Sequence, residues 1–121
     1  MRVKTTILLF LFAFFISSCA SKEERIKKIQ RQYPGWDQAV VEKVALREVE
    51  IGMTKDMVLA AIGKPYKTAL TGDEEKWTYA VIMERGEGSL YPEYVYFVYF
   101  TKGTVVRIEG DKSRLGLIPV R

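Results

Sequence analysis

The N-terminus limits what the rest of the chain can fold into. Arg2 and Lys4 precede an unbroken run of ten apolar residues, Ile7 to Ile16. As a helix this run spans about 15 Å, roughly half the hydrocarbon core of a bilayer, which is short for a transmembrane helix and typical of an export signal. We therefore expect residues 1–18 to be a removable signal peptide. This leaves 103 of the 121 residues, enough for one small domain.

The end of this signal carries a pattern for lipid attachment. The sequence Ile16-Ser17-Ser18-Cys19 resembles the lipobox of bacterial lipoproteins, and Cys19 is the only cysteine. The resemblance implies signal cleavage between Ser18 and Cys19, a diacylglyceryl group on the thiol and an N-acyl chain on the new amine. Ala20 follows where an Asp would direct retention, which favours the outer membrane under the enterobacterial sorting rule. The alternative is an ordinary signal peptide cut near the same place, with a free thiol left over.

The composition argues against catalysis. The chain has no histidine and one cysteine, so zinc sites, Ser-His or Cys-His nucleophile pairs and internal disulfides are not expected. Asp73, Glu74 and Glu75 are consecutive, which is typical of a solvated turn rather than of a convergent catalytic pair. We expect a non-enzyme with no cofactor beyond the covalent lipid on Cys19.

The charge balance does not indicate nucleic-acid binding. The net charge is +4, and removal of the signal peptide with Arg2 and Lys4 lowers it to +2, without a dense basic stripe. Basic side chains do gather in a helix predicted over residues 21–32: Arg25, Lys27, Lys28 and Arg31. We expect residues 19–35 to form the lipidated N-terminus and a basic helical stalk. Its basic residues either contact anionic lipid phosphates or are simply solvated.

Two short helices are expected after the stalk. Asp37 is a predicted N-cap in front of valines and alanines at helical spacing. Thr54 is a predicted N-cap of the next helix, while Gly63 and Pro65 end it, so the second helix is predicted over residues 55–62.

The second half of the domain alternates as antiparallel strands do. Strands are predicted over residues 76–84, 93–101 and 104–109, with a possible short strand at 66–70 and a tight hairpin through Lys102-Gly103. Helices followed by such strands predict a two-layer α+β fold, with the N-terminal helices on one face of a three-stranded antiparallel β-meander. We expect this domain over residues 36–110 and a C-terminal tail over 111–121.

Alternation divides the last hairpin into two faces. If Lys102 and Gly103 are the whole loop, Tyr99 faces Val106 and Phe97 faces Ile108. The aliphatic-rich set is assigned to the core: Val95, Phe97, Tyr99, Val106 and Ile108. The opposite set mixes aromatic and charged residues, and four of its members are the predicted partner-binding face: Tyr94, Tyr96, Phe100 and Arg107. The alternative is that the stalk helix or the tail covers these aromatics.

A combination of motifs resembles a known family. The motifs are Ile51-Gly52-Met53-Thr54, then Val58, Gly63 and Pro65, then Trp77-Thr78-Tyr79, and the hairpin Phe100…Gly103…Val105. Over about residues 49–109 they resemble the SmpA/OmlA domain of BamE-like outer-membrane lipoproteins. The resemblance implies an αα-β-β-β fold, no catalysis, a role beside the machinery that inserts β-barrel proteins, and contacts with partner subunits and anionic lipid. The chain departs from the family in its Trp36-Asp37 region and its long basic helix.

We therefore expect a lipid-anchored, non-catalytic envelope lipoprotein in the outer membrane, facing the periplasm. It would act as a protein-binding or scaffold module in outer-membrane assembly or maintenance. The alternative is an inhibitor-like or ligand-sensing periplasmic module of the same fold. The partner separates the two, because barrel-assembly subunits support the first and a single soluble hydrolase supports the second.

Overall fold

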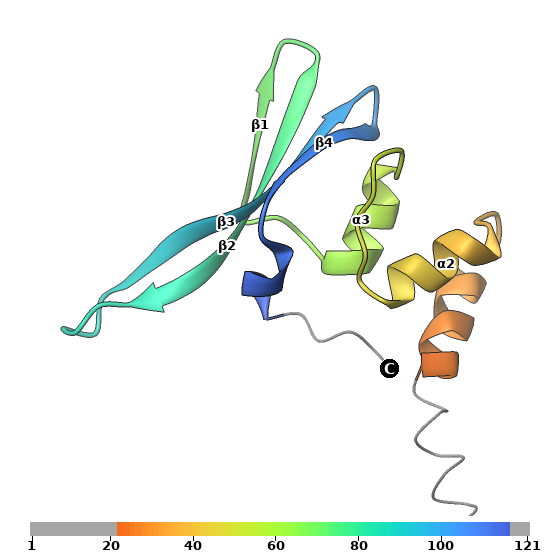
Figure 1. The fold of residues 1–121 in the computed structure, drawn as a ribbon, viewed down its shortest axis with the longest axis horizontal. Helices are drawn as coiled ribbons and strands as arrows, with labels where there is room; N and C mark the ends of the chain where they lie inside the picture. The colour runs from red at the N-terminus through yellow and green to blue at the C-terminus, as the bar shows by residue number, and fades with distance from the viewer. Residues whose placement is uncertain (1–21, 117–121) are drawn as a thin grey trace, which may run out of the picture.

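The computed structural model describes residues 22–116. The predicted signal peptide, the Ser18–Cys19 cleavage point and the Cys19 lipidation site lie outside these residues. Figure 1 shows the helices on one side of an antiparallel sheet. The elements are a helix over residues 22–32, α2 (Gln38–Ala45), α3 (Lys55–Ile62), β1 (Lys67–Thr71), β2 (Glu74–Glu84), β3 (Leu90–Thr101), β4 (Thr104–Gly110) and the 3-10 helix η1 (Lys112–Leu115). Within residues 22–116, no helix has the length and apolarity needed to cross a membrane.

Local signals place both short helices as predicted. Asp37 is the N-cap of α2 in an extended conformation, although its side chain makes no capping hydrogen bond. At α3, the Thr54 hydroxyl accepts a hydrogen bond of 3.3 Å from the Met57 amide. Gly63 then ends the helix with a φ of 82°, a value that a side chain would disfavour.

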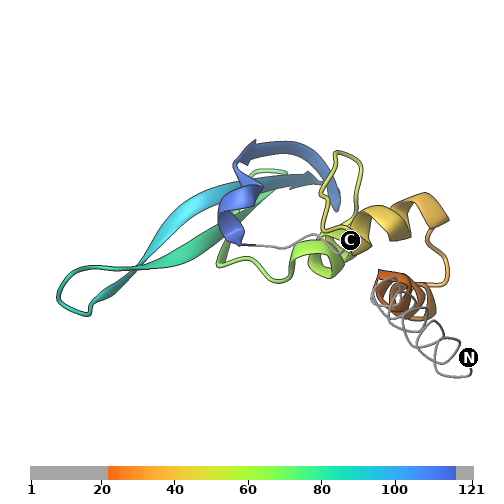
Figure 2. The ribbon, with the colours of Figure 1, turned by 60° about the horizontal axis from the view of Figure 1, so that its bottom comes forward.

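The sheet has four strands in the order β1-β2-β3-β4, each antiparallel to the next. The prediction of a three-stranded meander missed one pairing, because β1 forms a hairpin with β2 through Gly72 and Asp73, from Lys67↔Thr78 to Thr71↔Glu74. The α+β class and the placement of the helices on one face are confirmed. Figure 2 shows the same arrangement from a second direction.

The core lies between the helices and one face of the sheet. Its members from the helices include Val41, Val44, Val58 and Ala61, and those from the sheet include Trp77, Tyr79, Tyr96, Val98, Phe100 and Val105. Phe100 is 1% exposed, and its ring centre lies 4.6 Å from that of Trp77. The predicted assignment of faces is therefore wrong for most of this strand, since Tyr96 and Phe100 belong to the core and Phe97 and Tyr99 lie on the opposite face. Val95 belongs to the core, as predicted.

Two β-bulges explain how the faces divide. The register shifts between Tyr99 and Phe100, so Tyr99 pairs with Arg107 and Val106 is an extra residue, 43% exposed. A second shift lies where Tyr79 pairs with Tyr96 but Ala80 pairs with Tyr94. Each bulge moves the residues beyond it to the other face. Consequently Tyr94 and Arg107 lie on the face opposite Tyr96 and Phe100, and the predicted pairs of Tyr99 with Val106 and Phe97 with Ile108 do not form.

Strands β2 and β3 continue past their neighbours as a projecting ribbon. This distal hairpin, residues 80–94, extends away from the helices in Figures 1 and 2. Its turn is closed by a hydrogen bond of 2.9 Å from the Arg85 amide to the Ser89 carbonyl. At its base the chain after β4 forms η1, where the sequence has no periodic pattern. The Arg114 guanidinium pairs with Glu93 at 2.7 Å, which fixes η1 against β3.

Candidate binding surfaces

The face of the sheet turned away from the helices, here called the open face, carries cations over aromatic rings. The Lys76 ammonium lies 4.6 Å from the centre of the Phe97 ring. The Arg107 guanidinium carbon lies 3.9 Å from the centre of the Tyr99 ring. Although the described helices pack on the other face, Tyr99 is 8% exposed. The long stems of these cationic side chains shield the rings from water.

The charges of the open face are largely paired. Arg107 lies 3.0 Å from a Glu74 oxygen and 3.5 Å from a Glu109 oxygen. The Tyr99 hydroxyl donates a hydrogen bond of 3.1 Å to Glu109. Because the Arg107 side chain is still 51% exposed, it presents a charge and a planar donor to an incoming partner.

Tyr94 is the most accessible aromatic residue predicted for the binding face. It is 44% exposed, and the Lys67 ammonium lies 4.2 Å from the centre of its ring. The Tyr66 ring lies 6.0 Å away, which extends the aromatic surface toward α3. The structure thus brings two of the four predicted residues, Tyr94 and Arg107, to the open face. The other two, Tyr96 and Phe100, are buried under the helices.

Sequence reasoning missed the cations that accompany these rings. Lys67 and Lys76 lie on the open face because β1 and β2 pair as Lys67↔Thr78 and Ala69↔Lys76. That register follows from the two-residue turn between β1 and β2. A prediction that paired β1 with β2 across this turn would have placed both lysines on one face.

The polar side chains Tyr79 and Glu75 at the edge of the core are hydrogen-bonded. The Tyr79 hydroxyl donates a hydrogen bond of 2.9 Å to the Gly63 carbonyl, and burial raises the pKa of Tyr79. Glu75 accepts from Lys55 and from the Trp77 indole, both at 2.8 Å. The hydrogen bond from Lys55 lowers the pKa of Glu75, which burial opposes. Among residues 22–116, no group of three His, Cys, Asp or Glu side chains is placed to hold a metal ion.

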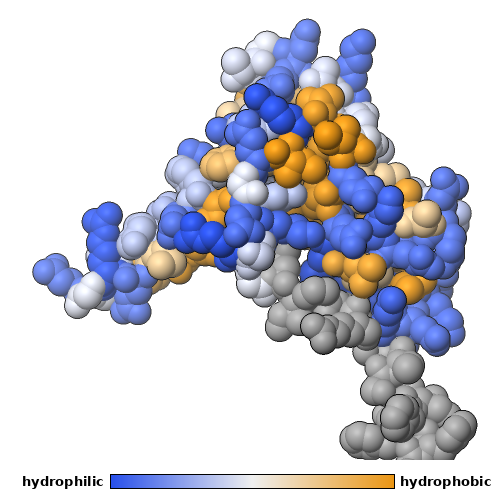
Figure 3. Space-filling model, in the orientation of Figure 1, coloured by the Kyte–Doolittle hydropathy of each residue, from blue (hydrophilic) through white to orange (hydrophobic). Residues whose placement is uncertain are grey.

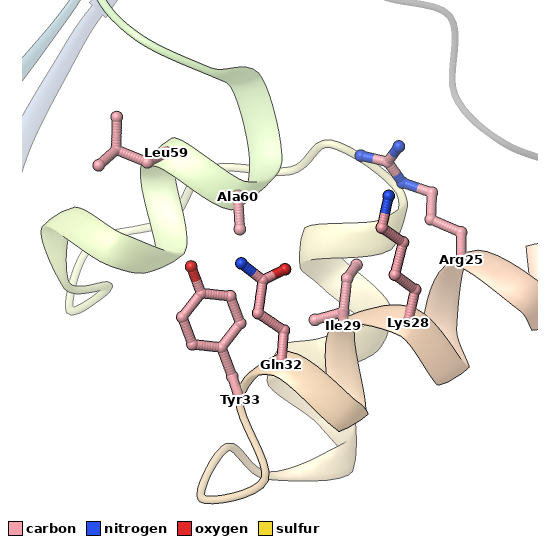
Figure 4. A pocket seen from close by; sticks show the side chains of 7 residues that line it. All are labelled: Arg25, Lys28, Ile29, Gln32, Tyr33, Leu59 and Ala60. Atoms are coloured by element: carbon pink, nitrogen blue, oxygen red, sulfur yellow. The ribbon is translucent and has the colours of Figure 1, made fainter.

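A groove of about 280 Å³ separates the helix 22–32 from α3 (Figure 4). It is lined by Arg25, Lys28, Ile29, Gln32, Tyr33, Leu59 and Ala60. In Figure 4, Gln32 and Tyr33 reach toward α3, so the lining mixes polar groups with apolar side chains such as Ile29 and Ala60. Arg25 joins the helix 22–32 to the end of α2, because its Nε donates a hydrogen bond of 3.1 Å to the Ala45 carbonyl. Burial lowers the pKa of Arg25.

The basic stalk residues therefore divide into two groups. Lys27, Lys28 and Arg31 are exposed along the helix 22–32, while Arg25 is half-buried against α2. The exposed three are therefore more accessible to solvent than Arg25, although the Arg31 Nε donates a hydrogen bond of 3.4 Å to the Lys27 carbonyl.

A small apolar patch lies where the chain before α3 meets β4. Ile51 is 70% exposed and Val106 is 43% exposed, and their segments are joined by a hydrogen bond of 2.9 Å from the Gly52 amide to the Val105 carbonyl. Figure 3 shows apolar side chains gathered beside β4 and a mainly hydrophilic surface over the helices.

The comparisons with known proteins point to one family. A family model described as the outer membrane protein assembly factor BamE domain matches residues 39–110. The match contains most of α2, all of α3 and the four strands. A search of curated proteins finds no relative that matches the chain.

Proposed function

Because the chain belongs to the BamE domain family, we propose that it is a lipid-anchored, non-catalytic protein-binding module that works in outer-membrane assembly or maintenance and faces the periplasm. The family match over residues 39–110 carries this proposal, since it includes the whole sheet. The mechanism is recognition by a preformed surface, with the membrane tether raising the local concentration of the module near its partners.

The anchor is the lipid on Cys19. Each buried methylene contributes about 0.8 kcal/mol, so two or three acyl chains hold the chain on a membrane almost permanently. Cells that express the full-length chain are fed labelled palmitate, and Cys19→Ala is compared with Ser21→Ala. Loss of both label and membrane association in Cys19→Ala alone supports the anchor. Label retained by Cys19→Ala contradicts it.

The proposed contact surface is the exposed part of the open face, centred on Tyr94 and Arg107. Tyrosine and arginine are enriched among residues that dominate binding energies, and a sheet presents them with little conformational freedom to lose. The pairing of Arg107 with Glu74 and Glu109 holds the guanidinium in place before a partner arrives.

Capture of the tagged full-length chain from detergent-solubilised membranes, with mass spectrometry of the bound proteins, tests this function. We expect outer-membrane assembly proteins with the wild-type chain, and a several-fold loss with Tyr94→Ala or Arg107→Ala. Lys43→Ala is the matched control, because Lys43 is an exposed cation in an ion pair with Glu50 on the helical side. Recovery of one soluble hydrolase instead would support an inhibitor-like module.

Contacts with anionic lipid by the exposed stalk residues are a further part of the proposal. Native mass spectrometry of the purified lipidated chain compares retained phosphatidylglycerol with phosphatidylcholine. The combined change of Lys27, Lys28 and Arg31 to Gln should remove the preference for the anionic lipid. Lys102→Gln, a cation in the β3–β4 turn, should leave it unchanged. A preference that survives the triple change contradicts this contact.

A further inference from the structure

The groove beside α3 is built in part by a helix that the family match does not include. The match begins at residue 39, whereas one wall of the groove is the helix 22–32. This helix is held by the core and by the turn before α2. The Ile29 side chain is 7% exposed in the core, and the rings of Tyr33 and Trp36 are stacked with their centres 3.9 Å apart. The groove is therefore a preformed feature that this chain adds to its BamE domain.

Cations gather at one end of this groove. Arg25 and Lys28 line it, and in Figure 4 both side chains extend toward the segment that joins α2 to α3. Arg47 lies in that segment, and its guanidinium donates a hydrogen bond of 3.3 Å to the Ala61 carbonyl, next to Ala60 in the groove lining. Burial lowers the pKa of Arg25, and the charge of Arg47 lowers it further. The two guanidinium groups are therefore close enough to repel each other.

Within residues 22–116, no carboxylate neutralises these cations. The ion pairs in this part of the chain use Lys43, Lys55, Arg107 and Arg114 instead. The two terminal nitrogens of Arg25 also make no hydrogen bond to another described residue, since only its Nε is used. Like charges that are held together without a counter-ion favour the binding of an anion. A guanidinium is suited to a planar carboxylate, which it can bind through two parallel hydrogen bonds.

The rest of the groove suits a short peptide segment. Its apolar lining comes from Ile29, Leu59 and Ala60, and Figure 4 shows Gln32 and Tyr33 toward the end away from the cations. A volume of about 280 Å³ lies just below the range of about 300–1,000 Å³ that is usual for small-molecule sites, so the groove can hold a few side chains. Polar groups toward both ends fit a peptide better than a lipid tail, because peptide amides continue on either side of an apolar side chain.

The acids of this chain do not account for the missing counter-charge. Glu24 and Glu48 are near Lys28 and Arg47 in the sequence, but neither is in any of the ion pairs formed among residues 22–116. Residues 1–21 and 117–121, which lie outside the described part of the chain, contain no Asp and no Glu. A carboxylate at this site would therefore come from another molecule.

We propose that the groove binds an extended acidic segment of another protein, in which an Asp or Glu lies next to an apolar residue. The carboxylate accepts hydrogen bonds from Arg25 and Lys28, and the charge of Arg47 adds to the attraction. The apolar side chain packs on Ile29 and Leu59, while the polar groups toward the far end of the groove meet the backbone of the segment. This contact is separate from the open face and does not depend on the lipid anchor.

Photo-cross-linking in cells that express the full-length chain tests the site. A photoreactive phenylalanine analogue replaces Gln32, which is exposed and lines the groove, or Asp56 on the exposed side of α3 as the control position. We expect position 32, but not position 56, to give an adduct on a protein segment in which mass spectrometry finds an Asp or Glu beside an apolar residue. Lys28→Glu should lower the yield several-fold. Lys64→Glu, an exposed cation after α3 and outside the groove, should leave the yield unchanged.

A charge exchange then tests the chemistry of the contact. Changing the mapped acid of the partner to Lys should restore the cross-link in the Lys28→Glu chain. Equal yields from positions 32 and 56, or a yield that Lys28→Glu leaves unchanged, would overturn the proposal. An adduct on a phospholipid would overturn it too, since Lys28 is also proposed to contact anionic lipid, as would an adduct on residues 1–21 or 117–121 or on a second copy. A cross-link from position 32 that persists with Tyr94→Ala would support a site that is separate from the open face.

Discussion

The two faces of the sheet keep their aromatic side chains from water in different ways. On the helical face, Trp77, Val98 and Phe100 are removed from water by α2 and α3. On the open face, Phe97 and Tyr99 are shielded by the stems of Lys76 and Arg107 instead. Aromatic residues thus occur on both faces, and the charged neighbours rather than the rings tell the two faces apart. Where no helix packs on a sheet, the stem of a long cationic side chain can therefore take over the covering of an aromatic ring.

The two faces should differ most in the loss of stability caused by replacing a phenylalanine of β3, Phe100 on the helical face or Phe97 on the open face. Phe100→Ala leaves a cavity in the core and should lower the free energy of unfolding by about 3–5 kcal/mol. Phe97→Ala should cost about 1–2 kcal/mol, since Phe97 is covered mainly by a flexible lysine stem. Denaturant titrations of the full-length variants measure both values. Equal losses would mean that the open face is as well packed as the core.

The next largest loss of stability is expected from a substitution at Gly110, which lies opposite the bulge that separates Tyr94 from Tyr96. A Cβ at Gly110 would lie 2.2 Å from the Val95 carbonyl oxygen, and its φ is +88°. Gly110→Ala should destabilise the chain by about 2–3 kcal/mol. Gly72→Ala is the control, with φ +62° and no atom near the added Cβ, and should cost about 1 kcal/mol. Thermal unfolding would contradict the account if Gly72→Ala were the more damaging change.

Tyr79→Phe tests the hydrogen bond from the Tyr79 hydroxyl to the Gly63 carbonyl, at the edge of the core. The change leaves the Gly63 carbonyl without its donor and should cost about 1–2 kcal/mol. The raised pKa of Tyr79 means that its contribution is complete below the ordinary tyrosine pKa of about 10 and is lost as the pH rises through the folded value. Unfolding titrations from neutral to alkaline pH should therefore converge for wild type and Tyr79→Phe. Parallel curves would contradict this.

The smallest effect is expected at the ion pair between α3 and β2. Lys55 lowers the pKa of Glu75 below its ordinary value, so the contribution is present above that value and disappears as the pH falls through the folded pKa. Glu75→Gln should cost less than about 1 kcal/mol at neutral pH, because the pair is partly exposed. The cost should vanish in acid. A larger loss that persists in acid would show that Glu75 supports the core through the Trp77 indole instead.

Local sequence signals predicted much of the fold. The capping residue Thr54 and the terminating Gly63 act within a few residues of the helix that they define, so α3 was predicted with its correct bounds. The strands β2 and β4 were recognisable from alternation. These features need no knowledge of distant contacts.

The faces of the sheet were not predictable by the same means. Alternation assigns every second residue to one face, but the bulges at Val95 and Val106 reverse the assignment beyond them. The bulges depend on how three strands pair, which is a long-range property. This is why the four residues of the predicted binding face divide between the two faces: Tyr94 and Arg107 lie beyond the bulges on the open face, while Tyr96 and Phe100 lie between them and are buried.

Site-specific photo-cross-linking tests most directly the claim that the chain works by binding envelope proteins through its open face. A photoreactive phenylalanine analogue replaces Tyr94 in one full-length chain and Glu42, on the exposed side of α2, in another. We predict cross-links from position 94 to an outer-membrane assembly protein, and none to that protein from position 42. Cross-links only from position 42, or none from either position to another envelope protein, would contradict the account.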